Sequence, residues 1–275
     1  MNQPRAMGFA ARIGLQQFWL FLYRVALAGM GYMNNDPRYN GEDHFLSRLA
    51  KVVGRESKHP VTIFDIGANE GDFSAGVASR LQDFAVHAFE PHPQTFARLQ
   101  RRFSGDPRFL LNHAAVAAST GHITLYDYDN ADGSNMASVF KATFEDIYPA
   151  KTHGLDIPAI TLDDYVEKNG IDRITLIKID VEGAEKLVLD GAQRTLQSGR
   201  IDAIQFEFNA HALIAGFSLL TVARILPDFD IYRMVSNGLV PVITSHKPYN
   251  TRVEIFKYCN CVALRRESSL HTLVS

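Results

Sequence analysis

Short runs of apolar residues alternate along the chain with longer stretches in which apolar residues recur at helical spacing. The short runs are rich in β-branched and aromatic residues, which is typical of buried strands. The seven expected core strands cover residues 61–64, 86–89, 109–116, 174–179, 201–208, 230–235 and 254–264. The helical spacing predicts helices over residues 41–53, 72–81, 93–103, 185–197 and 213–226. This alternation predicts an α/β fold with a mostly parallel sheet that helices cover on both faces.

Two further segments interrupt this alternation. Residues 121–128 alternate between apolar and polar positions, which predicts an exposed strand. The turn-rich loop that follows, Asp129 to Ser138, is of a kind that is uncommon inside a compact domain unless it is functional. Residues 160–166 read as the end of a strand that caps a short helix. The last residues, 267–275, are expected to form a frayed tail.

The N-terminal 40 residues contain a strongly apolar stretch, Phe18 to Ala28, with Arg5 and Arg12 upstream. Arg24 lies where a signal peptide avoids charge, which argues against that reading. The stretch is short for a membrane span, and Arg24 near its centre would cost roughly 2.5–3.5 kcal/mol on insertion. We therefore expect a helix that packs on the domain or on a partner chain. A helix that lies on a membrane surface is the alternative.

The first strand leads into a glycine turn, a helix and a second strand. Asp65 ends the first strand and is followed by the turn Gly67-Ala68-Asn69-Glu70-Gly71. Glycines let the backbone approach a ligand closely, and the helix that follows offers free N–H groups. Glu90 ends the second strand about 20 residues beyond the turn, where the acceptor of a ribose diol belongs in such folds. The unit therefore predicts a nucleotide site.

The residues of the turn distinguish between kinds of nucleotide. A dinucleotide fingerprint needs three glycines, and here Asn69 and Asp72 occupy two of those positions. Asp65 and Glu70 also place negative charge where a pyrophosphate would lie. These residues suit a ligand with a cationic end and no phosphate. S-adenosylmethionine, which carries a sulfonium, an ammonium and a ribose, has this chemistry.

Acidic and polar residues also follow the other predicted strands. In open α/β sheets ligands bind outside the carboxyl ends of the strands. The residues expected at that edge are Asp65, Glu90, Asn112, Asp180, Glu182, Glu207, Asn209 and His211. So many acidic groups are costly together unless a cation, a proton or a metal neutralises them. The edge is therefore the expected active site.

Composition limits the remaining choices. The chain has 275 residues and a formal net charge of −2, which argues against a nucleic-acid partner. Its two cysteines, Cys259 and Cys261, are too few for a disulfide framework or a zinc site, and we expect buried thiols in a reducing cytoplasm. The expected organisation is an N-terminal helical extension over 1–55, a cofactor-binding domain over 56–266 and a tail over 267–275.

Four sequence motifs resemble the FkbM-type family of S-adenosylmethionine-dependent methyltransferases. They are DIGANEGDFS, AFEPHPQTFARL, TLDDYV and LIKIDVEGAEKLVLDGA, and KIDVEGAE from Lys178 to Glu185 is the most specific of them. The resemblance covers roughly residues 41–264. It implies a Rossmann-like class I methyltransferase fold, with a mostly parallel seven-stranded sheet whose last strand is antiparallel. It also implies methylation of hydroxyl groups on sugars, polyketides and related small molecules.

The resemblance also assigns roles to residues. The expected cofactor-binding residues are Asp65, Gly67, Ala68, Asn69, Gly71, Glu90, Pro91, Asn112 and Ala115. In this assignment the glycine turn contacts the methionine part of the cofactor, Glu90 takes the ribose hydroxyls, and residues 112–115 flank the adenine. Asp180 and Glu182 lie beside the point of methyl transfer.

An alcohol acceptor must lose a proton during methyl transfer, and the sequence leaves several candidates for the group that takes it. The candidate bases are Asp180, Glu182, Glu207 and His211. Asp180 and Glu182 could instead hold a divalent cation such as Mg²⁺ that acidifies the hydroxyl, although the sequence does not establish a metal site. The 129–138 loop and the N-terminal helix are the expected acceptor lid.

The expected function is S-adenosylmethionine-dependent O-methylation of a sugar, a glycan or another small hydroxylated metabolite. An NAD(P)-dependent oxidoreductase on the same architecture is the rival enzyme, and the altered glycine fingerprint weighs against it. A non-catalytic S-adenosylmethionine-binding module is the third alternative. The expected location is the cytoplasm, with membrane-peripheral contact through the N-terminal helix as an open alternative. Self-association into a homo-oligomer is also left open.

Overall fold

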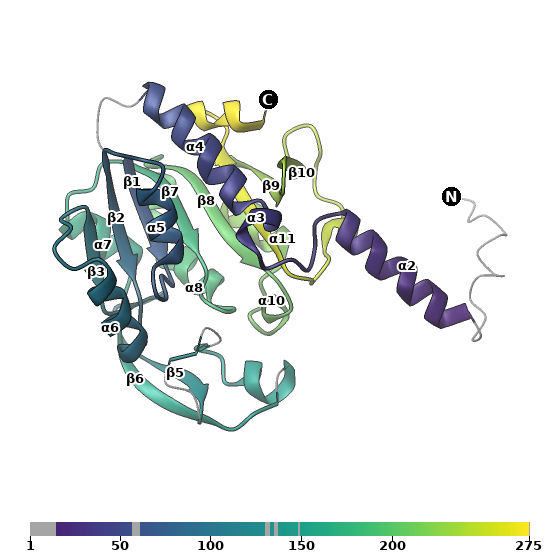
Figure 1. The fold of residues 1–275 in the computed structure, drawn as a ribbon, viewed down its shortest axis with the longest axis horizontal. Helices are drawn as coiled ribbons and strands as arrows, with labels where there is room; N and C mark the ends of the chain where they lie inside the picture. Colours follow the sequence, from purple (N-terminus) through teal and green to yellow (C-terminus); the bar gives the residue numbers. More distant parts are fainter. Residues whose placement is uncertain (1–14, 57–60, 130–132, 135–136, 148, 275) are drawn as a thin grey trace.

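A large sheet forms the centre of the molecule (Figure 1). The computed structural model describes residues 15–56, 61–129, 133–134, 137–147 and 149–274. The strand order is β10-β9-β11-β8-β7-β1-β2-β3. The bounds of these strands are β1 Val61–Ile66, β2 Phe84–Phe89, β3 Phe109–Asn112, β7 Ile174–Ile179, β8 Ile201–Phe208, β9 Phe229–Val235, β10 Gly238–Ile243 and β11 Cys259–Arg265. Neighbours from β3 to β8 pair in parallel, whereas β11 pairs antiparallel with both β8 and β9. All seven expected core strands are therefore present, although the one expected over 109–116 ends in this sheet at Asn112, and the mostly parallel sheet is confirmed.

The eighth strand, β10, was not predicted. It pairs antiparallel with β9 through a tight turn and forms one edge of the sheet. Its sequence carries a proline at position 241, which is typical of an edge strand but hides the strand pattern. The last strand also begins at Cys259 rather than at residue 254, and residues 251–253 before it form a short 3-10 helix.

Helices cover the sheet on both faces, as expected (Figure 1). Their bounds are α2 Gln16–Gly29, α3 Pro37–Asn40, α4 Glu42–Glu56, α5 Asp72–Ala78, α6 Pro93–Arg102, α7 Leu162–Lys168, α8 Glu185–Asp190, α9 Gln193–Gln197, α10 His211–Ile214 and α11 Leu219–Ile225. Successive strand residues point to opposite faces. Ile63 thus joins the cluster under α4, α5 and α6, whereas Phe64 joins the cluster under α7, α8 and α11. Because α4 contributes Phe45, Leu46 and Leu49 to the first cluster, it is part of the same core as β1.

Two expected helices are each divided in two. The helix expected over 185–197 breaks at Gly191, where an added Cβ would lie 2.1 Å from the carbonyl oxygen of Ala117. The helix expected over 213–226 breaks near Gly216, whose φ is +60°. The apolar pattern is continuous through both places. The close backbone contact at Gly191 and the left-handed φ at Gly216 nevertheless end the helices.

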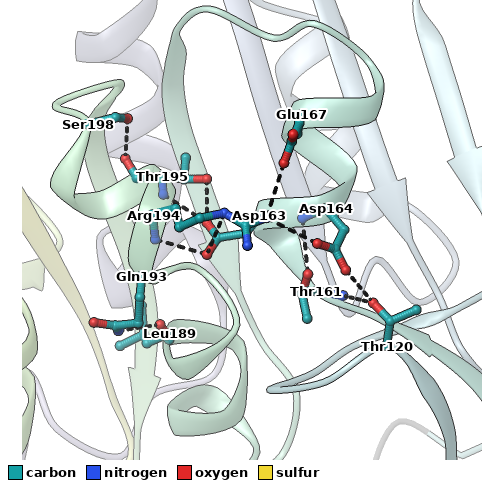
Figure 2. A network of polar contacts seen from close by, with 10 residues as sticks. All are labelled: Thr120, Thr161, Asp163, Asp164, Glu167, Leu189, Gln193, Arg194, Thr195 and Ser198. Atoms are coloured by element: carbon teal, nitrogen blue, oxygen red, sulfur yellow. Dashed lines mark hydrogen bonds and ion pairs between the residues drawn. The ribbon is translucent and has the colours of Figure 1, made fainter.

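The TLDDYV motif stabilises the start of α9, the helix that follows the break at Gly191. Thr161 caps α7 by accepting the N–H of Asp164 at 3.0 Å. The buried carboxylate of Asp163 accepts the N–H groups of Arg194 and Thr195, which lie in the first turn of α9 (Figure 2). Free N–H groups at a helix start are stabilised by such acceptors. The motif therefore joins α7 to α9, and the expected capping role of residues 160–166 is confirmed.

A second sheet of three strands, in the order β4-β6-β5, lies next to the loop region. Its strands are β4 Ala115–Val116, β5 Gly121–Tyr128 and β6 Thr152–Ile160. The exposed strand expected over 121–128 is confirmed as β5, whereas β6, its antiparallel partner, was not predicted. A π-helical turn, Thr143–Ile147, lies between them. Part of the 129–138 loop, residues 130–132 and 135–136, lies outside the described residues.

The two ends of the chain differ from what the sequence led us to expect. Residues 269–274 form a 3-10 helix that buries Leu270 and Leu273 against the α4 side of the sheet, so this segment is packed rather than frayed. The N-terminal helix α2 extends away from the body, and its only buried residue is Leu27 (Figure 1). The expected packing of this helix on the domain is therefore wrong for most of its length. Among the described residues no helix is both long and apolar enough to span a membrane. Arg5 and Arg12 lie outside the described residues.

Candidate active site

A cavity of about 750 Å³ lies at the carboxyl ends of the central strands. Residues after β1, β2, β7 and β8 form its walls, together with residues 33–42, 114–116 and 256–260. All four candidate bases line it, namely Asp180, Glu182, Glu207 and His211. Six of the expected cofactor-binding residues line it as well, namely Gly67, Ala68, Asn69, Glu90, Pro91 and Ala115. The sheet therefore brings together most of the residues that the sequence singled out.

Asp65, Gly71 and Asn112 were also expected to bind the cofactor, but they are not among the residues that line the cavity. The fully buried carboxylate of Asp65 accepts the Ser74 hydroxyl at 2.6 Å. A Cβ on Gly71 would meet the side chains of Phe103 and Leu99, so this glycine serves the packing of α6. The amide of Asn112 donates to the backbone carbonyls of Ala88 and Leu110. These three residues support the wall rather than form it.

Gly67 lines the cavity, but a different contact requires its lack of a side chain. Its φ is +80°, which favours glycine, and an added Cβ would lie 1.8 Å from the carbonyl oxygen of Asp180. The N–H of Asp180 in turn donates to the carbonyl of Ile66 at 2.9 Å. The glycine turn is thus fixed against the end of β7. We expected a close approach to the ligand at this position, and the structure shows a close approach to the protein backbone.

Glu90 is held at the end of β2 by two backbone donors. Its carboxylate oxygens accept the N–H of Asn69 at 2.9 Å and that of His92 at 2.8 Å. The side chain is buried, and this burial raises the pKa of Glu90 from its ordinary value of 4.5 to about 7, against the lowering effect of the two backbone hydrogen bonds. Each oxygen retains a lone pair that can accept a hydroxyl. The arrangement fits the binding of a ribose diol.

Lys178 is a central residue of the site that the sequence reading missed. It is the only charged residue in the apolar strand β7, and that isolation was the available signal. Its buried ammonium lies 2.8 Å from Asp180 Oδ2 and 3.9 Å from Asp65 Oδ1. Burial alone would lower the pKa of Lys178, but the carboxylates of Asp180, Asp65 and Glu42 raise it. Lys178 therefore carries a positive charge that joins the ends of β1 and β7.

The same ion pair sets the charge of Asp180. Burial alone would raise the pKa of Asp180, but the Lys178 ammonium and a hydrogen bond from Glu207 hold it below its usual value. The pKa of Glu207 is raised well above its ordinary value by burial and by the neighbouring carboxylates. Asp180 is thus held in its ionised form, and the raised pKa of Glu207 favours the protonated carboxyl that donates a hydrogen bond to Asp180.

Glu182 and His211 form the second polar pair at this edge. His211 Nδ1 lies 2.9 Å from Glu182 Oε2, and both side chains are largely buried. The backbone N–H of His211 donates to the side chain of Asn209, which fixes the start of α10. Burial raises the pKa of Glu182, and the hydrogen bond to His211 opposes that rise. A carboxylate that orients an imidazole in this way is a common arrangement for a general base.

The expected metal alternative finds no support in this geometry. The described part of the chain contains no group of three or more His, Cys, Asp or Glu side chains arranged to hold a metal ion. Asp180 is paired with Lys178, and Glu182 is paired with His211. The two carboxylates thus have separate cationic or imidazole partners.

Left-handed backbone conformations are concentrated at the cavity. Among the described residues the non-glycine positions with positive φ are Met33 at 66°, Asn69 at 49° and Glu182 at 49°, and all three line the cavity. Such conformations cost about 1–3 kcal/mol each and are found mainly at functional sites. The glycine turn and the KIDVEGAE turn are therefore both strained where they face the cavity.

The sequence reading also missed a part of the cavity wall that lies outside the predicted motifs. Asn40, Glu42, Tyr258 and Asn260 lie there, and the N–H of Met33 donates to the carbonyl of Tyr258 at 2.8 Å. No local motif marks these residues, because they come from the two ends of the chain. The expected lid is partly correct in position. Ser134, Ala137 and Val139 line the cavity, whereas residues 33–42, which follow α2, take the place expected for the N-terminal helix.

This fold and site define a class I methyltransferase. The features are a mostly parallel sheet with an antiparallel β11, a glycine turn after β1 and an acidic residue after β2. The model of the FkbM methyltransferase domain matches residues 65–231, which is more than half of the chain. The chain belongs to this family. It is an S-adenosylmethionine-dependent methyltransferase, and this membership decides against the oxidoreductase alternative.

Curated relatives of the chain are methyltransferases. It is 25% identical to the 2-O-methyltransferase NoeI of Sinorhizobium fredii over 69% of this chain and 80% of that protein. It is 29% identical to the 31-O-demethyl-FK506 methyltransferase FkbM of Streptomyces tacrolimicus, over 54% of this chain and 66% of that protein. It is 28% identical to the hexuronic acid methyltransferase AglP of Haloferax volcanii, over 54% of this chain and 57% of that protein. The chain thus spans less than two thirds of FkbM and of AglP.

Solved structures align more loosely. One is the putative methyltransferase SMU.1697c of Streptococcus mutans in complex with SAH. It is 9% identical, with a TM-score of 0.43, over 85% of this chain and 99% of that chain.

The residues at the site fit S-adenosylmethionine. The ionised Asp180 and the carboxylates near it suit the cationic end of the cofactor, and Glu90 suits its ribose. The small side chains of Ala114 and Ala115 leave room for a flat ring beside Pro91.

Proposed function

We propose that this protein transfers a methyl group from S-adenosylmethionine to a hydroxyl group of a sugar, a glycan or another small hydroxylated metabolite. The observation that carries the proposal is the His211–Glu182 pair on the wall of the cavity that also holds Glu90. The names of NoeI, FkbM and AglP describe O-methylation or methylation of a hexuronic acid, which supports an oxygen acceptor.

His211 is the general base in this proposal. Glu182 accepts the Nδ1 proton, so Nε2 is the ring nitrogen that takes the proton of the acceptor hydroxyl. Glu182 is a positioning residue that fixes the tautomer and stabilises the imidazolium that forms. Bound S-adenosylmethionine supplies the activated methyl group. The protein then has to align the acceptor oxygen with that methyl and remove one proton.

Lys178, Asp180 and Glu207 have a different task. The Lys178 ammonium keeps Asp180 ionised, so a carboxylate lies next to the cavity, and Glu207 donates a hydrogen bond to that carboxylate. We assign this group to the binding of the cationic end of the cofactor. Asp180 is already paired with an ammonium that lowers its pKa, so it is a poor base. In this assignment no divalent cation takes part.

The space beyond the cofactor residues suits a polar acceptor. Asn35, Asn40, Asn209 and Asn260 bring carboxamide groups to the cavity wall, and Tyr258 adds a hydroxyl. Carboxamides both donate and accept hydrogen bonds, as a polyhydroxylated ligand requires. We propose a small molecule or a glycan rather than a nucleic acid, because the chain carries a net charge of −2.

The experiment is incubation of the protein with methyl-labelled cofactor and a panel of sugar nucleotides, glycolipids and small phenols. We expect the label in an ether O–CH₃ group of one acceptor class. Transfer only to nitrogen or carbon would contradict the proposal. A thermal-shift measurement tests the cofactor separately: S-adenosylhomocysteine should raise the melting temperature, and NAD(P) should leave it unchanged. If S-adenosylhomocysteine binds and no acceptor in the panel is methylated, the proposed acceptor class is contradicted while cofactor binding stands.

A further inference from the structure

The exposed helix α2 has a composition that is unusual for a surface. Its residues 18–23 are all large and apolar, and all are exposed, from 37% for Leu22 to 61% for Phe21. Val25 is 52% exposed, and Figure 1 shows the helix extending away from the sheet. Contiguous apolar surface of this kind marks a contact site for a membrane or another protein. Within the chain only Leu27 of this helix is buried.

The arrangement of side chains around α2 resembles that of a helix lying in a membrane interface. Phe18, Phe21, Leu22 and Val25 follow the i, i+3, i+4, i+7 spacing and share one face. Gln17 and Arg24, seven residues apart, share a flanking face that lies about 110° around the helix from this one. The helix has 14 residues, so it is about 21 Å long and short of the roughly 30 Å hydrocarbon core of a bilayer. These features favour a helix that lies along the surface with its apolar face inserted.

The charge of this region distinguishes between a membrane and a second copy of the chain as the partner of α2. Residues 1–35 contain Arg5, Arg12 and Arg24 and no aspartate or glutamate, although the whole chain has a net charge of −2. Positive charge next to an inserted apolar face is attracted to anionic lipid. A second copy of the same helix would instead bring like charges together. The separation of charge therefore favours an anionic bilayer as the partner.

The segment after α2 connects this surface to the active site. Met33, Asn35, Pro37 and Asn40 follow the helix within a few residues and line the cavity. The segment is held to the domain by Tyr32, whose hydroxyl accepts a hydrogen bond from Arg233 at 2.6 Å. A bilayer that holds α2 would thus lie close to one wall of the cavity.

We propose that α2 docks the enzyme on an anionic membrane surface and brings its cavity to acceptors carried on lipids. The acceptor class that follows is a hydroxylated head group, such as a saccharide, attached to a lipid. This second part rests on the proposed O-methyltransferase function. The docking itself does not.

The docking is tested by sedimentation of the full chain with vesicles of phosphatidylcholine alone and of phosphatidylcholine mixed equally with phosphatidylglycerol. The wild-type protein should bind the mixed vesicles more tightly, and added salt should weaken that binding. Combined Phe18→Ser, Phe21→Ser and Val25→Ser changes should lower the partition coefficient at least about 100-fold. Arg24→Gln should lower it about fivefold on the anionic vesicles only. Leu110→Ser, at an exposed leucine on β3, is the matched control and should change nothing.

Equal vesicle binding by the wild type and the triple variant would overturn the proposal. So would a dimer in light scattering without vesicles that the triple variant abolishes, since the apolar face would then belong to a second copy. Calorimetry with S-adenosylhomocysteine keeps the two proposals separate, because the triple variant should retain wild-type affinity. Glycolipids in anionic vesicles should be methylated faster by the wild type than by the triple variant, and soluble acceptors equally. Equal rates on glycolipids would contradict the lipid-linked acceptor.

Discussion

The two sides of the cavity hold their carboxylates in different ways. At the ends of β1 and β2, Glu90 is held by the backbone N–H groups of Asn69 and His92. At the ends of β7 and β8, Asp180 and Glu182 are held by the side chains of Lys178 and His211. Neutral donors leave the pKa of the buried Glu90 raised, whereas the Lys178 ammonium keeps Asp180 ionised. The first side is thus suited to bind hydroxyl groups, and the second to hold charge and move a proton.

The largest expected effect concerns the proton acceptor. His211→Ala should lower turnover about 10²–10⁴-fold, which is the usual contribution of a general base, because it removes the imidazole that Glu182 orients. Glu182→Gln should cause a smaller loss and shift the pH profile, since it removes only the orienting charge. His122→Ala, at an exposed histidine paired with Asp156 on the small sheet, should leave turnover unchanged. Steady-state rates with saturating cofactor measure the turnover of these variants. Wild-type turnover by His211→Ala would transfer the role of base to Glu207 or Asp180.

The second prediction concerns the buried cation of the β7 side. Lys178→Met leaves Asp180 and Asp65 without their ammonium and should lower the free energy of unfolding by about 3–5 kcal/mol. Lys186→Met removes a half-exposed pair with Asp190 and should cost less than about 1 kcal/mol. Urea unfolding of both variants measures the difference. Equal losses would mean that Lys178 does not balance the charge of this edge.

The third prediction tests the contact that joins the two sides. Gly67→Ala combines a left-handed φ with a clash against the Asp180 carbonyl, and it should lower the free energy of unfolding by at least about 3 kcal/mol. Gly170 has a φ of +59° but no atom near the position of an added Cβ. Gly170→Ala should therefore lower the free energy of unfolding only by the cost of the left-handed backbone, about 1–2 kcal/mol. The comparison again uses urea unfolding. Similar losses in the two variants would show that the turn and β7 are not in close contact.

The fourth prediction concerns the pH dependence of cofactor binding. The pKa of Glu90 in the folded protein is about 7, and the ionised carboxylate is the better acceptor for ribose hydroxyls. The affinity for S-adenosylhomocysteine should therefore fall about tenfold between pH 8 and pH 6 as Glu90 takes up a proton. The stability of the cofactor-free protein should change with pH in the opposite direction to the affinity. Its stability should fall as the pH rises from about 4.5 to 7, because the unfolded chain ionises Glu90 first. Calorimetry measures the binding, and Glu90→Gln should remove its pH dependence. An unchanged slope in that variant would assign the titration to another group.

The sequence named residues on both sides of the cavity, but it described the β1–β2 side as one motif and did not predict the pairings on the β7–β8 side, and the reason is physical. The residues from Asp65 to Glu90 form one continuous unit, so a strand, a glycine turn and an acidic residue at fixed spacing identify the site. The fold is likewise predictable from the apolar runs. His211 and Lys178, in contrast, gain their roles from partners in space, and spacing along the chain does not show that Glu182 reaches His211.

Some residues have roles that local pattern reasoning does not reach. Asp65 and Gly71 belong to the glycine-turn motif, yet they contact Ser74 and α6 behind the wall. The distinction between a residue that contacts the ligand and one that supports it depends on side-chain packing. Tyr258 and Asn40 lie on the cavity wall because the two ends of the chain meet there. Strands β6 and β10 were missed because glycine and proline interrupt their apolar pattern.

The central claim is that binding of the cofactor's ribose by Glu90 and removal of the acceptor's proton by His211 are separate tasks on the two sides of one cavity. The most direct test is a double-mutant cycle of Glu90→Ala and His211→Ala on kcat/KM for S-adenosylmethionine, with calorimetric affinities for S-adenosylhomocysteine. Glu90→Ala should weaken that affinity about tenfold or more, since it leaves a buried diol unpaired at a cost of roughly 1–3 kcal/mol. His211→Ala should leave the affinity within about twofold, and the two losses in kcat/KM should multiply. If His211→Ala weakens binding as much as Glu90→Ala does, or if the double variant is no slower than His211→Ala alone, the division of tasks is contradicted.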